Sequence, residues 1–533
     1  MTTEEAMKIL NSEPRNHKMK IMEETIENLN SEPQNSKPRT SKEVLAQLNE
    51  LGKERKRKSA IEAEKLAQKK AEELAIAEVE KKAQEARNLD IAKEKKMLWE
   101  QKIAKKDQEI LDNQNPEMQT AYYELITTEK PKNEGLSAFE AVLSIGLDVT
   151  ELWYDQDGKA GITVSVNGHY EHYFVASDSF KDIIYSQSFK VNNTGLRKST
   201  YNEILENISS ICKYHGKLST SHLRIAENNG KTYIDLVNDK WEAIEVDEFG
   251  WRIVNPKNVK FIRTKNMRSQ CTPEKGGSIE ELKKFINLEK NEDFILLVGF
   301  ILKCLDPHSP YPILAFIGQQ GSGKSETSQM IISLVAPSHV PMLPMPSSER
   351  DFLIAAKNNH IFAIDNVSNI SKNQSDWICR LATNSGFTTR KLFTDSEEST
   401  MFLSRPLVLN GINDIVNRPD LIDRTLVINL PQISEEIRCT KQLLWKEFND
   451  NKPRILGAFC DGLSSAMRYL SLVELTKNPR MMDFAQFVTA AEVAFKWEYE
   501  TFLSAYLENI EDIYRILKNY KLSIFFSGAR GRT

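Results

Sequence analysis

The sequence predicts a mixed α/β protein whose centre is a three-layer sandwich, and three observations support this fold class. An apolar run, Ile313–Ile317, has the length and composition of a buried strand and leads directly into a glycine-rich turn. A second apolar run beginning at His360 ends at Asp365, and a third ends at Asn410. Helix-compatible segments accompany these strands, so the pattern favours an α/β core.

The glycine-rich turn after the first strand fits the pattern G-x-x-x-x-G-K-[ST] without a mismatch. Its three glycines let the backbone curl so that N–H groups face a phosphate chain, and the next helix adds the positive end of its dipole. We expect Lys324 to reach the β- and γ-phosphates of ATP and Ser325 to bind Mg²⁺. The alternative is a glycine-rich turn that only joins a strand to a helix. The predicted ATP contacts are Gly318, Gln319, Gln320, Gly321, Ser322, Gly323, Lys324, Ser325 and Glu326.

The composition bounds the class of protein without identifying a partner. A length of 533 residues suggests roughly two to four domains. The net charge is only −4, so a surface that binds nucleic acid would have to come from a local cluster of basic residues. The six cysteines are scattered without C-x-x-C pairs, which indicates neither a zinc site nor a disulfide framework and favours a cytoplasmic location. The longest apolar run, Phe294–Cys304, is too short to cross a bilayer, so we expect no membrane association.

The N-terminal part of the chain is highly charged. Residues 1–40 are polar and proline-containing, which predicts a disordered tail. Residues 41–113 lack proline and are dominated by Ala, Glu, Lys, Leu and Gln, which predicts one or two long helices. A solvated charged helix and a weak coiled coil or partner-binding arm both remain open. Residues 114–134 are interpreted as a linker.

Residues 135–265 are predicted to form a small α+β domain. Trp153–Phe174 alternates apolar and polar residues around two turn signals, which is typical of hairpins, and His222–Val254 again indicates short strands. Residues 266–435 are assigned to the ATPase core, which begins with two helical stretches before the first strand. Residues 436–533 are predicted to be a helical C-terminal region.

The two later strands carry further candidate site residues. Asp365 fits the Walker B position, where a carboxylate binds Mg²⁺ directly or through water. Asn410 is placed to sense the γ-phosphate or the attacking water. Arg418 and Arg424 supply guanidinium groups, either of which could complete a neighbouring subunit's site as an arginine finger, with Arg424 slightly favoured. Arg390 and Lys391 lie between aromatic residues and are candidates for contact with single-stranded DNA.

This ordered set resembles superfamily 3 helicases of the AAA+ class. More closely, the chain is similar to the ATP-binding proteins of phages, plasmids and integrated mobile elements that accompany primase–polymerases. The resemblance spans about 152–506 and rests on the Walker motifs, a basic hairpin at 386–393, and three more specific segments. These segments read IDNVS at 364–368, LNGI at 409–412 and DLIDRTLVINLP at 420–431.

The resemblance implies a replication ATPase that forms a homo-oligomeric ring on DNA, with a separate primase–polymerase as partner. It also exposes two departures. Asn366 stands where many relatives carry a catalytic Glu, and an amide cannot act as a general base. Glu349 and Asp351 are then candidates for that role. Relatives continue past the equivalent of Tyr506 into a helical, winged-helix-like tail, whereas here 521–533 fits no clear element, which leaves a truncated or frameshifted gene and a shorter tail as alternatives.

Two functions follow from these patterns. The first is an ATP-driven nucleic-acid motor, a replication helicase or primase-associated ATPase of a mobile element. The second is an ATP-gated switch or scaffold with slow hydrolysis and no translocation, which the amide at Asn366 and the long N-terminal arm favour. A primase or polymerase activity in this chain is disfavoured because 135–265 contains no convincing cluster of metal-binding carboxylates.

Overall fold

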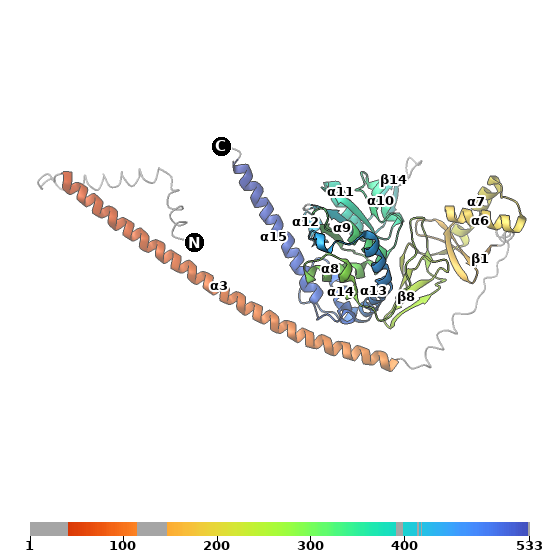
Figure 1. Ribbon diagram of the computed structural model, residues 1–533, viewed down its shortest axis with the longest axis horizontal. Coiled ribbons are helices and arrows are strands. Elements are labelled where there is room, and N and C mark those ends of the chain that lie inside the picture. Colours follow the sequence, from red (N-terminus) through yellow and green to blue (C-terminus); the bar gives the residue numbers. More distant parts are fainter. Residues whose placement is uncertain (1–40, 114–146, 391–397, 413–414, 417, 531–533) are drawn as a thin grey trace. The chain divides into compact units, whose positions relative to one another are not determined.

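The computed structural model describes residues 41–113, 147–390, 398–412, 415–416 and 418–530 (Figure 1). The predicted disordered tail at 1–40 and the predicted linker at 114–134 lie outside the described residues. The chain divides into two compact units, Met1–Ile91 and Ala92–Thr533. All the sheets belong to the second unit.

The first described element is the single helix α3, which runs from Ser41 to Asn113 over 73 residues. Most of its described side chains are exposed, as the charged composition requires. Trp99 is an exception, because it is 6% exposed and its ring lies 5.1 Å from the ring of Tyr499. Lys102 also pairs with Glu474 at 2.6 Å. The last turns of α3, which belong to the second unit, therefore pack on the C-terminal helices of that unit, a contact that the expectation of a solvated helix does not include.

A five-stranded parallel sheet forms the centre of the second unit. Its order is β12-β13-β16-β11-β17, so β16 lies between β11 and β13. Residue Phe316 of β11 is in register with Asn410 of β16 and with Ile428 of β17. The carboxyl ends of these strands therefore meet at one edge of the sheet. The strands are β11 (Ile313–Ile317), β12 (Met342–Leu343), β13 (Phe362–Val367), β16 (Leu407–Gly411) and β17 (Thr425–Asn429).

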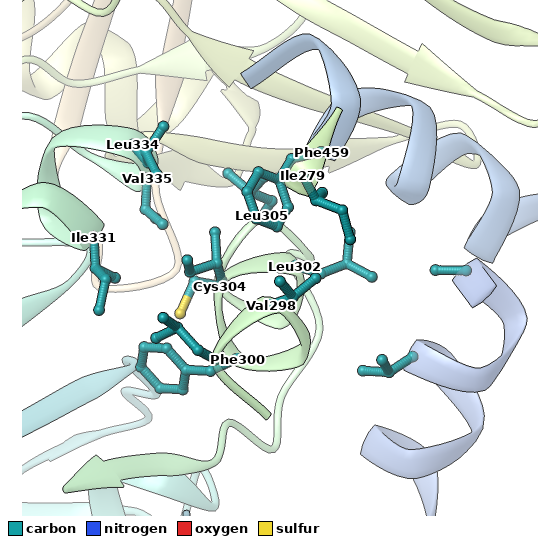
Figure 2. Close-up of a cluster of buried hydrophobic side chains, with 14 of the residues drawn as sticks. Ile279, Val298, Phe300, Leu302, Cys304, Leu305, Ile331, Leu334, Val335 and Phe459 are labelled. Carbon is teal, nitrogen blue, oxygen red and sulfur yellow. The ribbon is translucent and has the colours of Figure 1, made fainter. Parts of the chain in front are cut away.

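Alternate side chains of β11 enter two different hydrophobic cores, as the two-residue period of a strand requires. Leu314 and Phe316 belong to a core with α8 and α9, whereas Ile313 and Ala315 belong to a core with α10 and α11. Helices thus cover both faces of the sheet in three layers. Figure 2 shows part of the first core, where α8 residues lie among Ile331 and Val335 of α9 and Phe459. The covering elements are η1 (Ile279–Phe285), α8 (Asn291–Cys304), α9 (Lys324–Val335), α10 (Glu349–Asn358), α11 (Lys372–Ala382) and α12 (Pro419–Ile422).

The region expected to be one small α+β domain contains two four-stranded sheets with different surroundings and a two-stranded sheet. The first sheet has the order β3-β2-β1-β4 and its own core with α6 and α7, to which Val164, Phe180 and Ile208 contribute. These elements are β1 (Asp148–Tyr154), β2 (Ala160–Val166), β3 (His169–Phe174), α6 (Asp178–Asn192), α7 (Lys198–His215) and β4 (Lys217–Leu218).

The second sheet of this region is an antiparallel meander that packs on the ATPase core. Ile234 and Ile244 share a hydrophobic cluster with α8 and α9, because one face of the meander is apolar and meets α13. The expected 135–265 domain is therefore divided near residue 220. The strands are β6 (Ile225–Asn228), β7 (Lys231–Asp235), β8 (Ala243–Asp247) and β9 (Gly250–Val254), while β5 (Ser221–His222) pairs with β10 (Lys260–Phe261).

The C-terminal region is helical and returns to the core. Gly299 of α8 is the crossing point with α15, since a Cβ there would lie 2.4 Å from the ring of Phe502. The helix α15 continues to Arg530, so the expectation that 521–533 fits no element is corrected for its described part. No proline interrupts that stretch. The elements are η2 (Glu435–Ile437), α13 (Lys441–Tyr469), η3 (Leu470–Leu472), α14 (Met482–Phe495) and α15 (Thr501–Arg530).

None of the helices within the described residues is long and apolar enough to cross a bilayer.

Candidate functional site

The turn between β11 and α9 takes a backbone course that its glycines make possible. A Cβ on Gly318 would lie 2.5 Å from the carbonyl oxygen of Leu430, so only glycine fits there. Gly321 and Gly323 adopt φ values of +82° and +88°, which L side chains rarely adopt. Ile433 donates its N–H to the Gly321 carbonyl at 3.2 Å, so the segment after β17 closes over the turn.

The N-terminus of α9 is open toward this turn. Its N-cap is Gly323, and no side chain caps the first backbone N–H groups, which leaves them available to an anion. Lys324 Nζ donates to the carbonyls of Gly318 and Gln319 at 2.6 and 2.9 Å. Partial burial lowers the pKa of the Lys324 ammonium from its ordinary value, and the nearby Asp365 carboxylate opposes this shift.

Four side chains from three elements form a polar chain beside the turn. Ser325 Oγ lies 3.4 and 3.5 Å from the two carboxylate oxygens of Asp365. Asn410 Nδ2 donates to Asp365 Oδ1 at 3.0 Å, and Asn410 Oδ1 accepts from Ser328 Oγ at 2.8 Å. Asn410 is fully buried, and the two hydrogen bonds fix the orientation of its amide.

Three of these residues, Ser325, Asp365 and Asn410, border one pocket of about 510 Å³ at the carboxyl edge of the sheet. Asn366 also borders it, is exposed, and has a φ of +55°, which asparagine tolerates better than most residues. Of the predicted ATP contacts, Gly318 and Gln319 do not line the pocket, whereas Gly411 and Ile412 line it without having been predicted. The predicted residues that line it are Gln320, Gly321, Ser322, Gly323, Lys324, Ser325, Glu326, Asp365, Asn366 and Asn410.

Oxygen ligands of the kind that Mg²⁺ prefers converge in this pocket. The Ser325 hydroxyl and the Asp365 carboxylate face each other across a distance that a hydrogen bond barely spans. A hydroxyl and a carboxylate at the end of a glycine-rich turn are the donors that hold Mg²⁺ against phosphates. The residues present therefore fit a Mg²⁺-bound nucleoside triphosphate.

Glu326 has partners that the sequence did not suggest. Its carboxylate accepts from Trp445 Nε1 and from Lys441 Nζ, both at 2.7 Å, so the first turn of α9 is tied to the start of α13. Arg438 was also missed; its Nη2 lies 3.7 Å from where a Cβ on Gly321 would be. The four-residue spacing of Lys441 and Trp445 was the available signal, because it places both on one face of a helix.

The two other acidic candidates for a catalytic base lie elsewhere and do not line the pocket. Glu349 pairs with Arg380 of α11, and Asp351 accepts from Ser348 at 2.6 Å at the N-terminus of α10. Glu349 therefore links α10 to α11, and Asp351 contacts the residue that caps α10. Neither is placed to act as the base.

The candidate arginine fingers also lie away from this pocket. The carbonyl of Arg424 accepts from Ile313 N–H at 2.8 Å, at the start of β11, so Arg424 is at the amino edge of the sheet. A five-residue strand separates the two edges by about 16 Å. Within the described part of the chain, Arg424 Nη1 donates to the Asp420 carbonyl, whereas Arg418 is held by Asp376 and by the Lys372 carbonyl, both at 2.9 Å.

The basic segment expected to contact nucleic acid lies on a two-stranded hairpin. Strands β14 (Phe387–Arg390) and β15 (Glu398–Met401) are antiparallel, and Arg390 is in register with Glu398. Lys391 lies outside the described residues. The hairpin departs from α11 of the same core, because Phe387 is fully buried against the layer that contains Ile378.

Comparison with known proteins gives one family match and several structural likenesses. The family model described as Actinomycete integrative conjugative element replication protein matches residues 279–514, which is less than half of the chain. The matched segment contains the glycine-rich turn, Asp365 and Asn410. It is thus similar to a replication protein of a mobile element. A search of curated proteins gave no match.

Among solved structures, the apo A form of the NrS-1 C-terminal region is 14% identical, with a TM-score of 0.37. The likeness covers 61% of this chain and 68% of that chain. A structure described as SCCmec type IV Cch, an active helicase, is 13% identical and also has a TM-score of 0.37. That likeness covers 71% of this chain and 74% of that chain.

Proposed function

We propose that this protein is an ATP-hydrolysing motor that acts on DNA during replication of a mobile element. The observation that carries the proposal is the convergence of Lys324, Ser325 and the Asp365–Asn410 pair on one pocket. The family match to a replication protein over residues 279–514 supports the biological setting. We also propose that this ATPase is of the superfamily 3 type within the AAA+ class.

The side chains have separate roles in the proposed reaction. Lys324 and the backbone N–H groups at the start of α9 bind the β- and γ-phosphates, and Ser325 and Asp365 would hold Mg²⁺, which neutralises phosphate charge when bound. Asn410 holds Asp365 in position and, from the pocket wall, would sense the γ-phosphate or the attacking water. Asn366 orients water, since an amide cannot take a proton from it.

The positions of Arg418 and Arg424 fit a ring better than a monomer. Neither arginine is among the described residues that line the pocket of its own chain, and Arg424 stands at the opposite edge of the sheet. We infer that subunits assemble head to tail, so that this edge of one subunit faces the nucleotide of the next. Arg424 is the better finger because its guanidinium is less engaged than that of Arg418.

The hairpin β14–β15 is the proposed contact with single-stranded DNA, through Arg390 and Lys391. The test is ATP-dependent separation of a forked duplex by Arg390→Ala/Lys391→Ala. We expect unwinding to fall while nucleotide binding stays near that of the wild type, because no residue of β14 or β15 is among the described residues that line the pocket. A double variant that unwinds DNA as well as the wild type would show that the hairpin is not the contact.

The second candidate is an ATP-gated switch or scaffold, and a specific observation favours it. Glu326 and Asp365 are the acidic side chains among the described residues of the pocket, and both are already engaged. A site without a free general base hydrolyses ATP slowly. In this case α3 would dock a partner, such as a primase–polymerase, and removal of residues 1–91 would abolish that interaction without changing ATP affinity.

A further inference from the structure

A second polar cavity of about 330 Å³ lies between α9 and α13, next to the candidate ATP site. Trp445, Asn449 and Lys452 border it from α13, and their spacing of four and three residues places them on one face of that helix. Gln329 and Ser333 border it from α9. The two remaining walls are the loops at 268–269 and 337–341.

The side chains that line this cavity are all cationic, neutral polar or apolar. Lys452, Arg268 and His339 are basic, and no Asp or Glu is among the described residues that line the cavity. Arg268 and His339 are exposed, whereas Lys452 is buried, and a buried cation normally has an opposite charge beside it because an isolated buried charge is costly. The absence of a carboxylate beside Lys452 in the described lining therefore suggests that a bound anion supplies the opposite charge.

Lys452 makes the case for a ligand. Lys452 is only 6% exposed, and no carboxylate that could pair with its ammonium is among the described residues that line the cavity. The pKa of Lys452 is lowered to about 8, mainly by burial; the Cys271 thiol opposes this shift, whereas the nearby Arg224 and Arg268 contribute to it. A second group in the same cavity wall, the buried hydroxyl of Ser338, also lacks a hydrogen-bond partner among the residues described.

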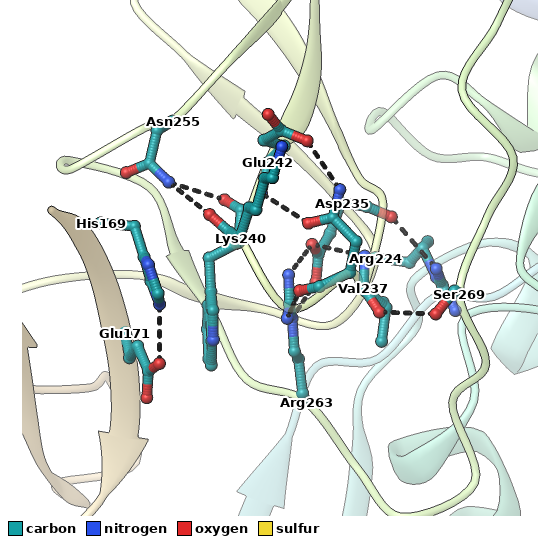
Figure 3. A network of polar contacts seen from close by, with 12 residues as sticks. His169, Glu171, Arg224, Asp235, Val237, Lys240, Glu242, Asn255, Arg263 and Ser269 are labelled. Carbon is teal, nitrogen blue, oxygen red and sulfur yellow. Dashed lines mark hydrogen bonds and ion pairs between the residues drawn. The ribbon is translucent and has the colours of Figure 1, made fainter. Parts of the chain in front are cut away.

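The walls of the cavity are built before any ligand arrives. Arg224 Nη2 donates to the carbonyls of Arg268 and Pro337, each at 3.0 Å, and so joins the two loops. Gln270 Nε2 ties the first loop to the Leu334 carbonyl at the end of α9 at 2.7 Å. Figure 3 shows the same network extending through Asp235 and Arg263, with Ser269 bound to the Val237 carbonyl.

Arg224 adds positive charge behind the wall. It is 1% exposed, and its Nε has no hydrogen-bond partner in the described part of the chain. Cations, hydroxyls and amides thus surround a space in the range of ligand pockets.

We propose that this cavity binds a phosphate group, with Lys452 as its central ligand and Arg268 at its mouth. The phosphate belongs either to a small molecule of nucleotide or pyrophosphate size or to a nucleic-acid strand that passes the opening. The site is separate from the glycine-rich turn, although Trp445 borders the cavity and also binds Glu326. This inference does not depend on ATP hydrolysis.

The test is protection of Lys452 from an acylating reagent, read by mass spectrometry on the full chain. The background is Lys324→Ala, so that the glycine-rich turn does not contribute to phosphate binding. Pyrophosphate is the first probe and a single-stranded oligonucleotide is the second. Lys446, an exposed lysine of the same helix, is the internal control.

We expect pyrophosphate, the oligonucleotide or both to protect Lys452 and to leave Lys446 labelled. Protection by pyrophosphate alone would show that the cavity binds a small phosphate-containing molecule. Protection by the oligonucleotide would show that it binds the phosphate of a nucleic-acid strand. If neither probe protects Lys452, or if Lys452 is not labelled even without a probe, the proposal is overturned.

A second measurement tests the role of Lys452 by substitution. In the Lys324→Ala background, the protecting probe should raise the thermal midpoint of the chain. Adding Lys452→Met should weaken probe affinity by about tenfold or more, because a hydrogen bond to a charged group is lost. Adding Lys446→Met should leave the affinity unchanged. If the Lys452→Met and Lys446→Met variants bind the probe with equal affinity, the assignment is contradicted.

Discussion

Asn410 Nδ2 donates a hydrogen bond of 3.0 Å to Asp365 Oδ1, although 45 residues separate the two side chains in the chain. The pairing arises because β16 lies directly beside β13 in the parallel sheet. Ser328 completes the arrangement from α9 by fixing the other end of the amide. The carboxylate that would hold Mg²⁺ is therefore oriented by a buried amide that a second element holds in place.

Asn410→Asp should inactivate the site without unfolding it. The substitution keeps the size of the side chain but replaces the donor with an acceptor, and two carboxylates at this distance cannot both be ionised. We expect ATP hydrolysis to fall by about 10- to 100-fold, as for other groups that orient metal ligands. Steady-state turnover at saturating Mg²⁺ and ATP measures the effect. Turnover equal to that of the wild type would rule out the role of Asn410.

Trp445→Phe should weaken nucleotide binding by a different route. The ring keeps its edge contact with Phe448, at a centroid distance of 5.6 Å in the wild type, but loses the N–H that holds Glu326. The Glu326 carboxylate keeps its contact with Lys441, but its second oxygen loses a donor and repels phosphates beside the glycine-rich turn more strongly. We expect an affinity loss of about two- to tenfold, the usual value of one hydrogen bond.

Titration with a fluorescent ATP analogue measures this loss, and Leu443→Ala on the exposed face of α13 is the control. Salt should reduce the difference, since it screens the repulsion. Tighter binding by Trp445→Phe would contradict the proposed role of the hydrogen bond.

Lys452 should make the protein more stable as the pH rises above neutrality. Its pKa is about 8 in the folded chain and 10.5 ordinarily, so between these values the unfolded chain binds more protons. The free energy of unfolding therefore increases with pH across this window, by about 3 kcal/mol in total for this group. The thiol of Cys271 lies near the same lysine, and burial raises the pKa of this thiol.

Lys452→Met should flatten that pH dependence and stabilise the protein at pH 7, because the buried charge is removed. Urea unfolding at pH 7 and pH 10 measures both effects, and Lys446→Met should retain the wild-type slope. A Lys452→Met variant that is less stable than the wild type at pH 7 would show that the charge is compensated.

Arg424→Ala should abolish hydrolysis but preserve ATP binding if the finger acts between subunits. The decisive form of the experiment mixes two inactive proteins, Arg424→Ala and Lys324→Ala. Mixed rings contain interfaces in which an intact Lys324 pocket meets an intact Arg424, so hydrolysis should reappear. Its absence under conditions where subunits exchange would contradict a finger supplied in trans.

Features that depend on neighbouring residues could be predicted from the sequence, whereas contacts between residues far apart in the chain could not. The glycine-rich turn and the helix after it follow from neighbouring residues, and the positive φ values of Gly321 and Gly323 fit their type. That Asn410 would meet Asp365, and that Arg424 would be at the far edge, depends on strand order. Likewise, nothing near Trp99 or Lys452 in the sequence indicates burial, because their surroundings come from distant elements.

The measurement that tests the central claim most directly is ATP hydrolysis by the full chain with and without single-stranded DNA, using Lys324→Ala as the blank. The account predicts hydrolysis that DNA stimulates strongly and that disappears in Lys324→Ala, since this lysine supplies charge to the γ-phosphate. Tight ATP binding with slow hydrolysis that DNA does not change would contradict the motor and support the switch. Hydrolysis that survives in Lys324→Ala would contradict the site itself.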